Sequence, residues 1–226
     1  MSTDVFSSFD GDGQGSLADK AYVQLREAII RVDLAPGSVL REDELMRWAG
    51  AGRTPVREAI QRLHRDGFVT IIPRRGTLVS EINITDLAAI YEVRAHLESW
   101  AARLAAERAG DSDHDTAAGL IAELEALRPD DGYEPLLTTD RRIHRFAYAC
   151  ARNGFLAQTL DQYQNLSLRI LHVAMKRYPT LTPRLDEVVH DQRMLLQAIM
   201  DNDGPAAERA AAQHVLTFER EIRQVI

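Results

Sequence analysis

The 226-residue sequence has only one cysteine, Cys150, so an internal disulfide is excluded. So few cysteines are typical of proteins in a reducing compartment. The sequence also lacks any hydrophobic run long enough for a membrane span. Its first 16 residues, MSTDVFSSFDGDGQGS, have neither the basic start nor the apolar stretch of a secretory signal. We therefore expect a soluble, cytoplasmic protein without a membrane partner, in which residues 1–16 form a flexible tail.

What the sequence does contain is enough hydrophobic residues, 45%, for a folded core. Its length fits one large domain or two small ones. The charge is unevenly distributed, because residues 1–80 hold 11 basic and 11 acidic side chains while residues 81–226 hold 16 and 23. This asymmetry predicts two domains with different roles.

The stretch 52–68, GRTPVREAIQRLHRDGF, has the pattern of an amphipathic helix. Thr54 is a favourable helix N-cap, and Pro55 suits the first helical position, where no amide hydrogen is missed. Apolar residues recur at the spacing of one helical face, at Val56, Ala59, Ile60 and Leu63. The opposite side is polar and basic, with Thr54, Arg57, Gln61 and Arg65.

This stretch forms a positive island in an acidic protein. Between residues 53 and 75 there are six arginines against Glu58 and Asp66, a local net charge of +4, whereas the whole chain carries −7. Such an island indicates a local anionic partner, most simply DNA. The alternative is a solvated helix face on an ordinary α-helical domain.

Two further helices are predicted before this one, over residues 17–32 and from Glu42 onward, the latter with Leu45, Trp48 and Ala49 buried. Two short helices joined by the glycine-containing turn 50–52 form a helix-turn-helix pattern. In that pattern the second helix lies in the major groove with its first residues nearest the bases. Those residues are Arg53, Thr54 and Arg57.

After the basic helix, residues 69–73 and 77–79 are predicted as two strands of a hairpin, or wing, with Arg74 and Arg75 at its tip. Arginines at such a tip can reach phosphates or a minor groove. The alternative is that they are loop arginines surrounded by water.

The segments LAPGSVLREDEL (34–45), GRTPVREAIQRLHRDGF (52–68) and PRRGTLV (73–79) resemble the winged-helix DNA-binding domain of GntR-family bacterial transcription regulators. The resemblance implies operator contacts from the start of the second helix-turn-helix helix and from the wing. Where some family members have a basic residue at the start of the preceding helix, this chain has Asp43, with Arg41 nearby. The candidate DNA-binding residues are Arg41, Arg53, Thr54, Pro55, Arg57, Gln61, Arg75 and Gly76.

Beyond a short linker at 81–84, the pattern predicts helices over 85–109, 113–127, 135–151, 155–176, 183–201 and 205–225. The segments YEVRAHLESWAARLAAE (91–107), DRRIHRFAYACARN (140–153) and DNDGPAAERAAAQH (201–214) resemble the FCD effector-binding domain of the FadR-like branch of the family. The fold class is therefore mainly α. A winged helix-turn-helix at 17–80 is followed by an all-helical effector-binding and dimerisation domain at 85–226.

Several polar residues fall on the inward faces of these predicted helices. Arg94 and Glu98 lie within an apolar stripe, so they either pair with each other at the i, i+4 spacing or line a pocket. Asp140 and His144 also share one inward face. His214 and Gln192 lie 11 residues on either side of the turn near Asp203, which places them at one level of an antiparallel helix pair.

An inward Asp and two histidines on neighbouring helices can hold a divalent metal, zinc or a similar ion. The FCD resemblance implies such a site with one Asp and three histidines, but Gln192 stands where the third histidine is expected, and His190 is turned about 160° away. Two alternatives remain open. One is a site formed by Asp140, His144 and His214 with Gln192 assisting, and the other is a metal-free polar pocket.

The resemblance implies a homodimer that binds a palindromic operator, most simply as a repressor, and is released by a small carboxylic acid. Candidate residues for the acid are Arg94, Glu98, Arg169 and Gln192. The competing interpretation is a metal-dependent hydrolase that uses the Asp/His site, with Glu98 as its general base. We disfavour it, because no HExxH motif or Gly-rich phosphate loop occurs.

Overall fold

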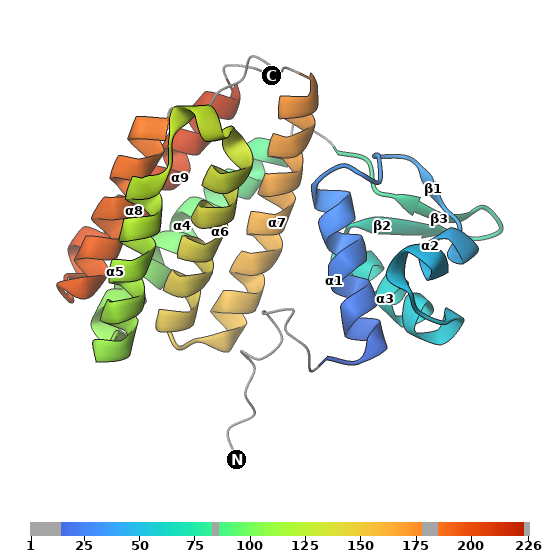
Figure 1. Ribbon diagram of the computed structural model, residues 1–226, viewed down its shortest axis with the longest axis horizontal. Coiled ribbons are helices and arrows are strands. Elements are labelled where there is room, and N and C mark those ends of the chain that lie inside the picture. The colour runs from blue at the N-terminus through green and yellow to red at the C-terminus, as the bar shows by residue number, and fades with distance from the viewer. Residues whose placement is uncertain (1–14, 83–85, 178–184, 224–226) are drawn as a thin grey trace. The chain divides into compact units, whose positions relative to one another are not determined.

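The computed structural model describes residues 15–82, 86–177 and 185–223, except for the side chains of Pro129 and Glu221. The described chain divides into two units, drawn in Figure 1. The first unit comprises the described residues up to position 82 together with Leu168–Val173. The second comprises the remaining described residues, and it contains most of the helices.

The first unit is a winged helix. Helix α3 packs against α1 and α2, and the three strands form an antiparallel sheet in the order β1-β3-β2. Strands β2 and β3 are the hairpin, with Val69 opposite Val79 and Ile72 opposite Gly76. The two-residue strand β1 was absent from the sequence prediction. The elements are α1 (Leu17–Ile30), β1 (Val39–Leu40), α2 (Glu42–Ala49), α3 (Arg53–Arg65), β2 (Val69–Ile72) and β3 (Gly76–Val79).

Helix α1 begins at a side-chain cap and ends at a residue with a left-handed backbone, and neither feature follows from its apolar periodicity. At its start, Ser16 and Asp19 form a capping box: the Asp19 amide donates to Ser16 Oγ (3.2 Å), and the Ser16 amide donates to Asp19 Oδ2 (3.0 Å). At its end, Val32 has φ +60°, a left-handed conformation that cannot continue an α-helix. The predicted helix end at Val32 is therefore wrong by two residues, and Ser16 belongs to a cap rather than a tail. The rest of the predicted tail lies almost wholly outside the described residues.

Helix α3 begins two residues earlier than predicted. Its N-cap is Gly52, in an extended conformation (φ −71°, ψ 175°) and without a side-chain cap, so the assignment of Thr54 as N-cap is wrong. Pro55 is tolerated at the third helical position, because the first four amide groups of a helix lack intrahelical partners in any case. The predicted apolar face is confirmed, since the four side chains Val56, Ala59, Ile60 and Leu63 are buried.

The prediction for α2 is only partly right. Leu45 is buried, but Trp48 is 47% exposed and Ala49 is half-buried. A helix of eight residues contacts its neighbours through one narrow strip, and here that strip is centred on Leu45. The left-handed Gly50 (φ +57°) then ends α2 and starts the turn into α3.

The second unit is an all-helical bundle, which confirms the predicted fold class (Figure 1). Most predicted helix ends lie within two residues of the observed ones, while those near 183 and 225 fall outside the described residues. A short 3-10 helix, η2 (Pro129–Asp131), separates α5 from α6. The helices are α4 (Asp86–Arg108), α5 (Asp111–Ala126), α6 (Tyr133–Cys150), α7 (Gly154–Arg177), α8 (Leu185–Met200) and α9 (Gly204–Arg223).

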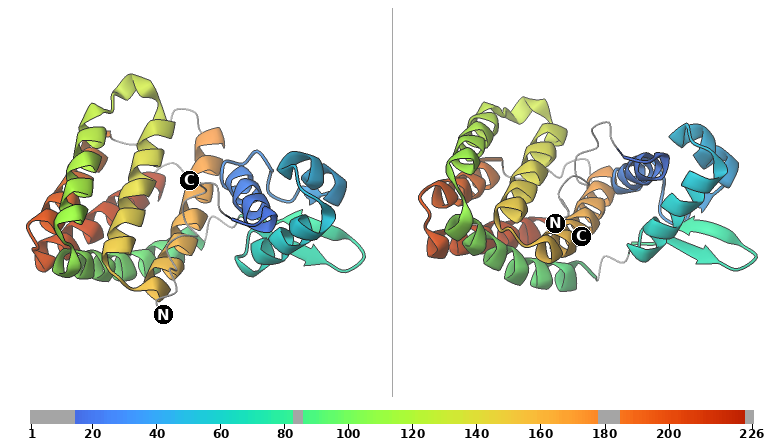
Figure 2. Two further views of the ribbon diagram at one scale, coloured as in Figure 1. Left: turned by 60° about the horizontal axis from the view of Figure 1, so that its bottom comes forward. Right: turned by 90° about the horizontal axis from the view of Figure 1, so that it is seen from below.

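Small residues bring two helices of this bundle together. Helices α4 and α9 pack over a long common surface (Figure 2), and their contact includes fully buried alanines at 102, 105, 106, 207 and 211. Alanine side chains allow the helix axes to approach closely. Glu98 lies one turn before Ala102, and His214 lies one turn after Ala211. A polar cluster therefore begins where the alanine layer ends.

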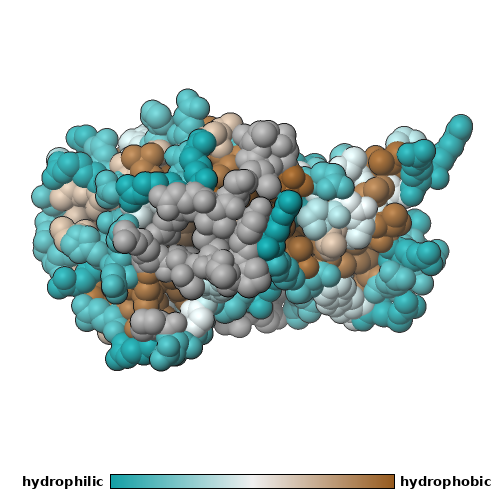
Figure 3. Space-filling model, turned by 90° about the horizontal axis from the view of Figure 1, so that it is seen from above, coloured by the Kyte–Doolittle hydropathy of each residue, from teal (hydrophilic) through white to brown (hydrophobic). Residues whose placement is uncertain are grey.

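The surface contrasts with this core. In the view of Figure 3 most of the described residues at the surface are hydrophilic, and the hydrophobic ones form small, separate patches. Within the described ranges, no helix is both long and apolar enough to cross a membrane.

Candidate functional site

The polar face of α3 is exposed along its length. Arg53, Thr54, Arg57 and Gln61 are all exposed, and Pro55 is half-buried. Because α3 starts at Arg53, Arg53 and Thr54 lie in its first turn and Arg57 lies just beyond it. The unpaired amide groups and the positive end of the helix dipole are also found there. This end of α3 has the charge and the donor groups needed to contact an anionic polymer.

Two further exposed groups extend this surface within the same unit. Arg75 and Gly76 lie at the wing tip, where Arg74 (φ +65°) and Gly76 (φ +97°) both have left-handed backbones that turn the hairpin sharply. Arg41 is exposed at the N-cap of α2. Asp43, also exposed, pairs with Arg47 at 3.5 Å.

Glu42 is a member of this surface that sequence reasoning missed. Its carboxylate contacts both Arg57 and Arg53 across the turn between α2 and α3. The sequence places Glu42, Asp43 and Glu44 at the helix start, where acidic side chains favour the helix dipole, and this gives no sign of a contact with α3. Its pairing with the next helix depends on the crossing of α2 and α3.

In the second unit, Arg94 is buried at the centre of a polar network. Its Nε donates to Glu98 Oε1 at 2.6 Å, and its NH1 donates to Ser167 Oγ on α7 at 2.7 Å. Ser167 Oγ in turn donates to the hydroxyl of Tyr91 at 2.8 Å, and the Arg94 guanidinium carbon lies 5.1 Å from the centre of the Tyr91 ring. The predicted Arg94–Glu98 pair is therefore present, and both side chains are nearly inaccessible to solvent.

A second set of polar side chains continues from this pair. His144 Nδ1 lies 2.9 Å from Glu98 Oε2, so α6 is joined to the ion pair on α4. The other ring nitrogen of His144, Nε2, lies 3.2 Å from His214 Nε2 on α9. Asp140 Oδ1 is 3.1 Å from His214 Nε2, and Asp140 Oδ2 is 3.6 Å from His144 Nε2.

Asp140, His144 and His214, all buried, bring one donor atom each to a common point, with all three atoms within 4.8 Å of one another. Donor atoms about 2.0–2.1 Å from a tetrahedral zinc are roughly 3.3 Å apart. His214 Nε2 lies 3.1 Å from Asp140 Oδ1 and 3.2 Å from His144 Nε2, close to that value, while the 3.6 Å separation joins His144 Nε2 to the other carboxylate oxygen, Asp140 Oδ2. The donor set and its spacing therefore fit a zinc-like ion.

Gln192, fully buried on α8, occupies the fourth side of this cluster. Its Nε2 lies 2.6 Å from Asp140 Oδ1 and 3.0 Å from His214 Nε2, while its Oε1 is buried without a hydrogen-bond partner. With the nitrogen facing inward, the amide donates to Asp140 and cannot act as a ligand. Rotating the amide by half a turn would present the oxygen, a neutral donor weaker than imidazole.

The charges of this cluster stabilise one another. Burial would raise the pKa of Glu98, but Arg94 and His144 outweigh it and hold this pKa at about 2. Burial acts in the same direction on Asp140, but His144 and His214 keep the pKa of this carboxyl far below its usual range. For His144, burial would lower the pKa, whereas Glu98 and Asp140 raise it. Both carboxyl groups are thus ionised at neutral pH, as cation binding requires.

Arg169, a candidate effector-binding residue, and His190, a histidine considered as a metal ligand, lie outside this cluster. Arg169 is in the segment of α7 that belongs to the first unit, where its guanidinium donates to the backbone oxygen of Ser80, and burial lowers its pKa to about 10.

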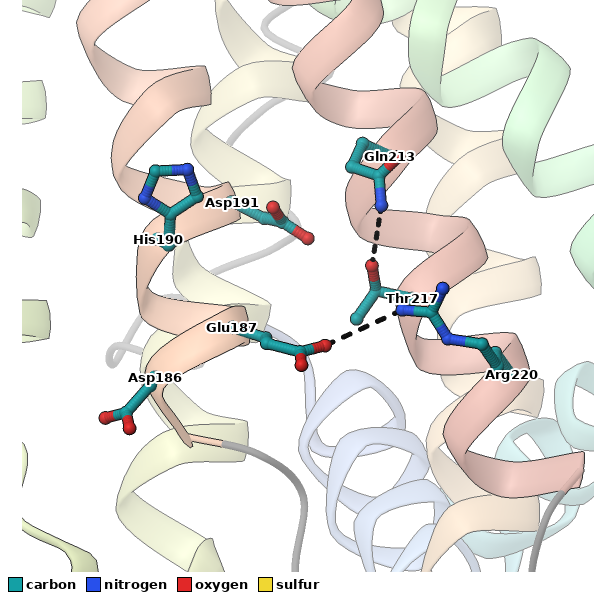
Figure 4. Close-up of a pocket in the computed structure, with 7 residues that line it drawn as sticks. All are labelled: Asp186, Glu187, His190, Asp191, Gln213, Thr217 and Arg220. Carbon is teal, nitrogen blue, oxygen red and sulfur yellow. Dashed lines mark hydrogen bonds and ion pairs between the residues drawn. The ribbon is translucent and has the colours of Figure 1, made fainter.

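His190 is exposed, as its position off the inward stripe predicted. It borders an open groove of about 300 Å³ between α8 and α9 (Figure 4). The groove is lined by Asp186, Glu187, His190, Asp191, Gln213, Thr217 and Arg220.

The sequence prediction also missed two buried polar residues on α7, Ser167 and Gln164. Besides Ser167, Gln164 is almost fully buried, and neither its amide oxygen nor its amide nitrogen has a partner. Leu160 packs in one cluster with Ala101, and Ser167 bonds to Arg94. These two contacts show that α7 runs antiparallel to α4 here. Gln164, between Leu160 and Ser167, therefore lies near the level of Glu98. The sequence contained one signal for this, because Gln164 is a polar residue at a heptad position where an apolar residue is expected.

A winged helix with an exposed basic recognition helix, followed by a helical bundle with buried charged side chains, defines a two-part DNA-binding transcription regulator. Comparison with known proteins agrees. The model of "Bacterial regulatory proteins, gntR family" matches residues 17–79, and the FCD domain model matches residues 89–217. The chain belongs to the GntR family of bacterial transcription regulators and carries an FCD domain, so it is a regulator and not a hydrolase.

Individual relatives extend over most of the chain. The HTH-type transcriptional repressor GlaR of Escherichia coli K12 is 28% identical over 204 residues, covering 87% of this chain and 91% of that protein. The repressor RspR of the same strain is 28% identical over 210 residues, covering 90% and 88%. Among solved structures, E. coli McbR/YncC has the same fold, with a TM-score of 0.81 at 23% identity, covering 93% of this chain and 99% of that one.

The buried Arg94–Glu98 pair yields a stability prediction. We expect Glu98→Ala to lower the free energy of unfolding by about 3–5 kcal/mol, because it leaves the Arg94 charge buried without its partner. The control is Glu107→Ala on the same helix, which removes the half-exposed partner of Arg103 (3.0 Å) and should cost about 0–1 kcal/mol. Urea unfolding followed by circular dichroism measures both. Equal, small losses would show that Arg94 is solvated in solution.

Proposed function

We propose that this protein is a ligand-responsive repressor that binds a palindromic operator as a homodimer and leaves it when a small carboxylic acid binds the helical unit. We assign DNA binding to residues 17–80, a linker to 81–84, and effector binding with dimerisation to 85–226. The observation that carries the proposal is the buried guanidinium of Arg94 beside an Asp/His cluster, in a chain whose other unit has an exposed basic recognition helix.

The assignment to DNA rests on the start of α3. One winged helix reads a short half-site, and a two-fold symmetric dimer then recognises a palindrome. Arg53, Thr54 and Arg57 are the residues we expect nearest the bases, with Arg41, Gln61 and the wing residues Arg75 and Gly76 beside them. Repression, rather than activation, is supported by the relatives GlaR and RspR, which are both named as repressors.

The assignment to a carboxylic acid rests on the chemistry around Arg94. A guanidinium binds a carboxylate with two parallel hydrogen bonds, and such bonds are strong when water is excluded. Around it, Ser167, Tyr91 and the unpartnered amide of Gln164 supply hydroxyl and amide groups that can bind polar atoms of an acid. We assign Glu98 and Gln192 to the walls of the same site, and Arg169 remains a candidate.

The assignment of a divalent metal rests on charge as well as spacing. A histidine that binds a metal must be neutral, and in that state the positive Arg94 and the negative Glu98 and Asp140 give the cluster a net charge of −1. A bound divalent cation, held by Asp140, His144 and His214, would reverse that sign and could attract an effector carboxylate. Gln192 in place of an imidazole should make the site weaker than one with three histidines.

Specific DNA recognition can be tested at Arg57. We expect Arg57→Ala to weaken binding to the selected operator by about 1–3 kcal/mol, the value of a bidentate guanine contact, and to relax preference at one base pair. Arg65→Ala removes the same charge nearer the other end of α3 and should weaken operator and random duplexes by a similar factor. Fluorescence anisotropy at one fixed salt concentration compares them. Parent-like operator binding by Arg57→Ala would show that α3 does not read DNA through this residue.

Effector binding can be tested with a thermal-shift screen of small carboxylic acids. An acid that raises the melting temperature should also weaken operator binding, and operator DNA must weaken binding of that acid by the same factor. Arg94→Lys should reduce the thermal shift, because an ammonium cannot form the two-pronged contact, whereas the exposed Arg103→Lys should not. A broad panel without a hit would count against the proposal.

Metal binding can be tested without knowing the effector. Protein purified without chelator should contain up to one zinc-like ion per chain, and added zinc should raise its melting temperature. His144→Ala should abolish both effects, His190→Ala on the exposed face of α8 should leave them intact, and Gln192→His should increase metal retention. If added zinc neither binds nor stabilises the parent, the cluster is a metal-free polar pocket.

A further inference from the structure

One carboxylate at the start of α2 contacts both arginines at the start of α3. Glu42 Oε1 accepts a hydrogen bond from Arg57 Nε, while Glu42 Oε2 lies 3.2 Å from Arg57 NH2 and 3.4 Å from Arg53 Nε. The side chains of Arg57 and Arg53 are 64% and 66% exposed, whereas that of Glu42 is 30% exposed. The acidic group therefore lies beneath two guanidinium groups that otherwise face solvent.

We propose that Glu42 is a positioning residue for DNA recognition: it sets the sequence specificity of α3 by fixing the orientation of Arg57 and by reducing the attraction of Arg53 and Arg57 for phosphates. The inference rests on the proposed function, because it requires that α3 reads an operator. It adds a residue that carries the wrong charge for contacting DNA itself.

The orientation argument follows from the shape of a guanidinium group. Arginine offers two paired donor edges, one formed by Nε and NH2 and the other by NH1 and NH2. Glu42 occupies the first edge of Arg57, so the second edge points away from the carboxylate. That free edge can donate two parallel hydrogen bonds to O6 and N7 of guanine. Glu42 thus holds Arg57 in one orientation before DNA arrives, and less side-chain freedom is lost on binding.

The electrostatic argument concerns competing DNA. Binding to random duplexes comes almost entirely from contacts between cationic side chains and phosphates. Hydrogen bonding from Arg57 keeps the pKa of Glu42 below its ordinary value, so the carboxylate is charged at neutral pH and partly neutralises both arginines. A phosphate must compete with this fixed carboxylate, whereas the free edge of Arg57 remains available to a base. Specificity, a difference between two affinities, increases when the non-specific one is lowered.

The neighbouring residue provides a matched control. Asp43 is also exposed at the start of α2, but it pairs with Arg47 of its own helix at 3.5 Å, and within the described part of the chain it forms no ion pair with Arg53 or Arg57. Asp43→Asn and Glu42→Gln remove the same charge from adjacent positions. Only Glu42→Gln releases Arg57 and Arg53. A general effect of net charge should therefore be equal in the two variants.

The experiment measures the affinity of the full-length parent and variants for a selected operator and for a random duplex, over a series of salt concentrations. For Glu42→Gln we expect the ratio of operator to random affinity to fall about tenfold, with tighter binding to the random duplex and a steeper salt dependence on it by about one unit of slope. Asp43→Asn should leave the ratio unchanged. Thermal unfolding checks that both substitutions leave the fold intact.

A double-mutant comparison separates positioning from charge removal. In the Arg57→Ala background, Glu42→Gln should no longer reduce preference at the base pair that Arg57 reads, because the group it positions is absent. The inference is overturned if Glu42→Gln keeps the parental ratio, raises it, or only matches Asp43→Asn. A parent that prefers no operator at all would instead contradict the proposed function, so the two failures are distinguishable.

Discussion

The second unit depends on one constraint, which is the burial of the Arg94 charge. A guanidinium cannot lose its proton in a protein, so it must be compensated by charge and hydrogen bonds. Glu98 on α4 supplies the opposite charge, and Ser167 on α7 supplies a hydrogen-bond acceptor. Glu98 then needs a partner for its second oxygen, and His144 Nδ1 lies 2.9 Å away. The remaining nitrogen of His144 faces His214 and Asp140, so a single buried cation organises polar groups on four helices.

In the first unit, the ion pairs of α3 lie at the surface and not in the core. Arg53 and Arg57 on α3 are exposed, and there an ion pair contributes little to stability because water competes with it. The pairs of Glu42 with Arg57 and Arg53 therefore make little difference to folding, and their effect is on where the guanidinium groups point. Buried pairs in this protein hold helices together, whereas exposed pairs on α3 prepare a surface for a partner. This difference follows from solvent exposure and not from the residue types, which are the same.

Much of the fold was predictable, because amphipathic periodicity is a local signal. The buried face of α3, the helical bundle and the wing hairpin all followed from it. The errors arose where a single cap or contact overrides periodicity. Val32 leaves the helix through a left-handed backbone, Gly52 rather than Thr54 caps α3, and Trp48 is exposed because α2 is short. The two-residue strand β1 is stable only through its pairing with β3, so it has no signal of its own.

Patterns within the sequence were sufficient to predict the two-part architecture, the basic face of α3, and the inward positions of Arg94, Asp140, His144 and His214. Each follows from spacing along one helix or from two helices joined by a short turn. The packing of the folded chain sets which side chains meet across helices that are distant in sequence. It joined Arg94 to Ser167, turned the amide nitrogen of Gln192 toward Asp140, and set Glu42 beneath Arg57. Such contacts depend on how helices cross, and no periodicity within a single helix contains that information.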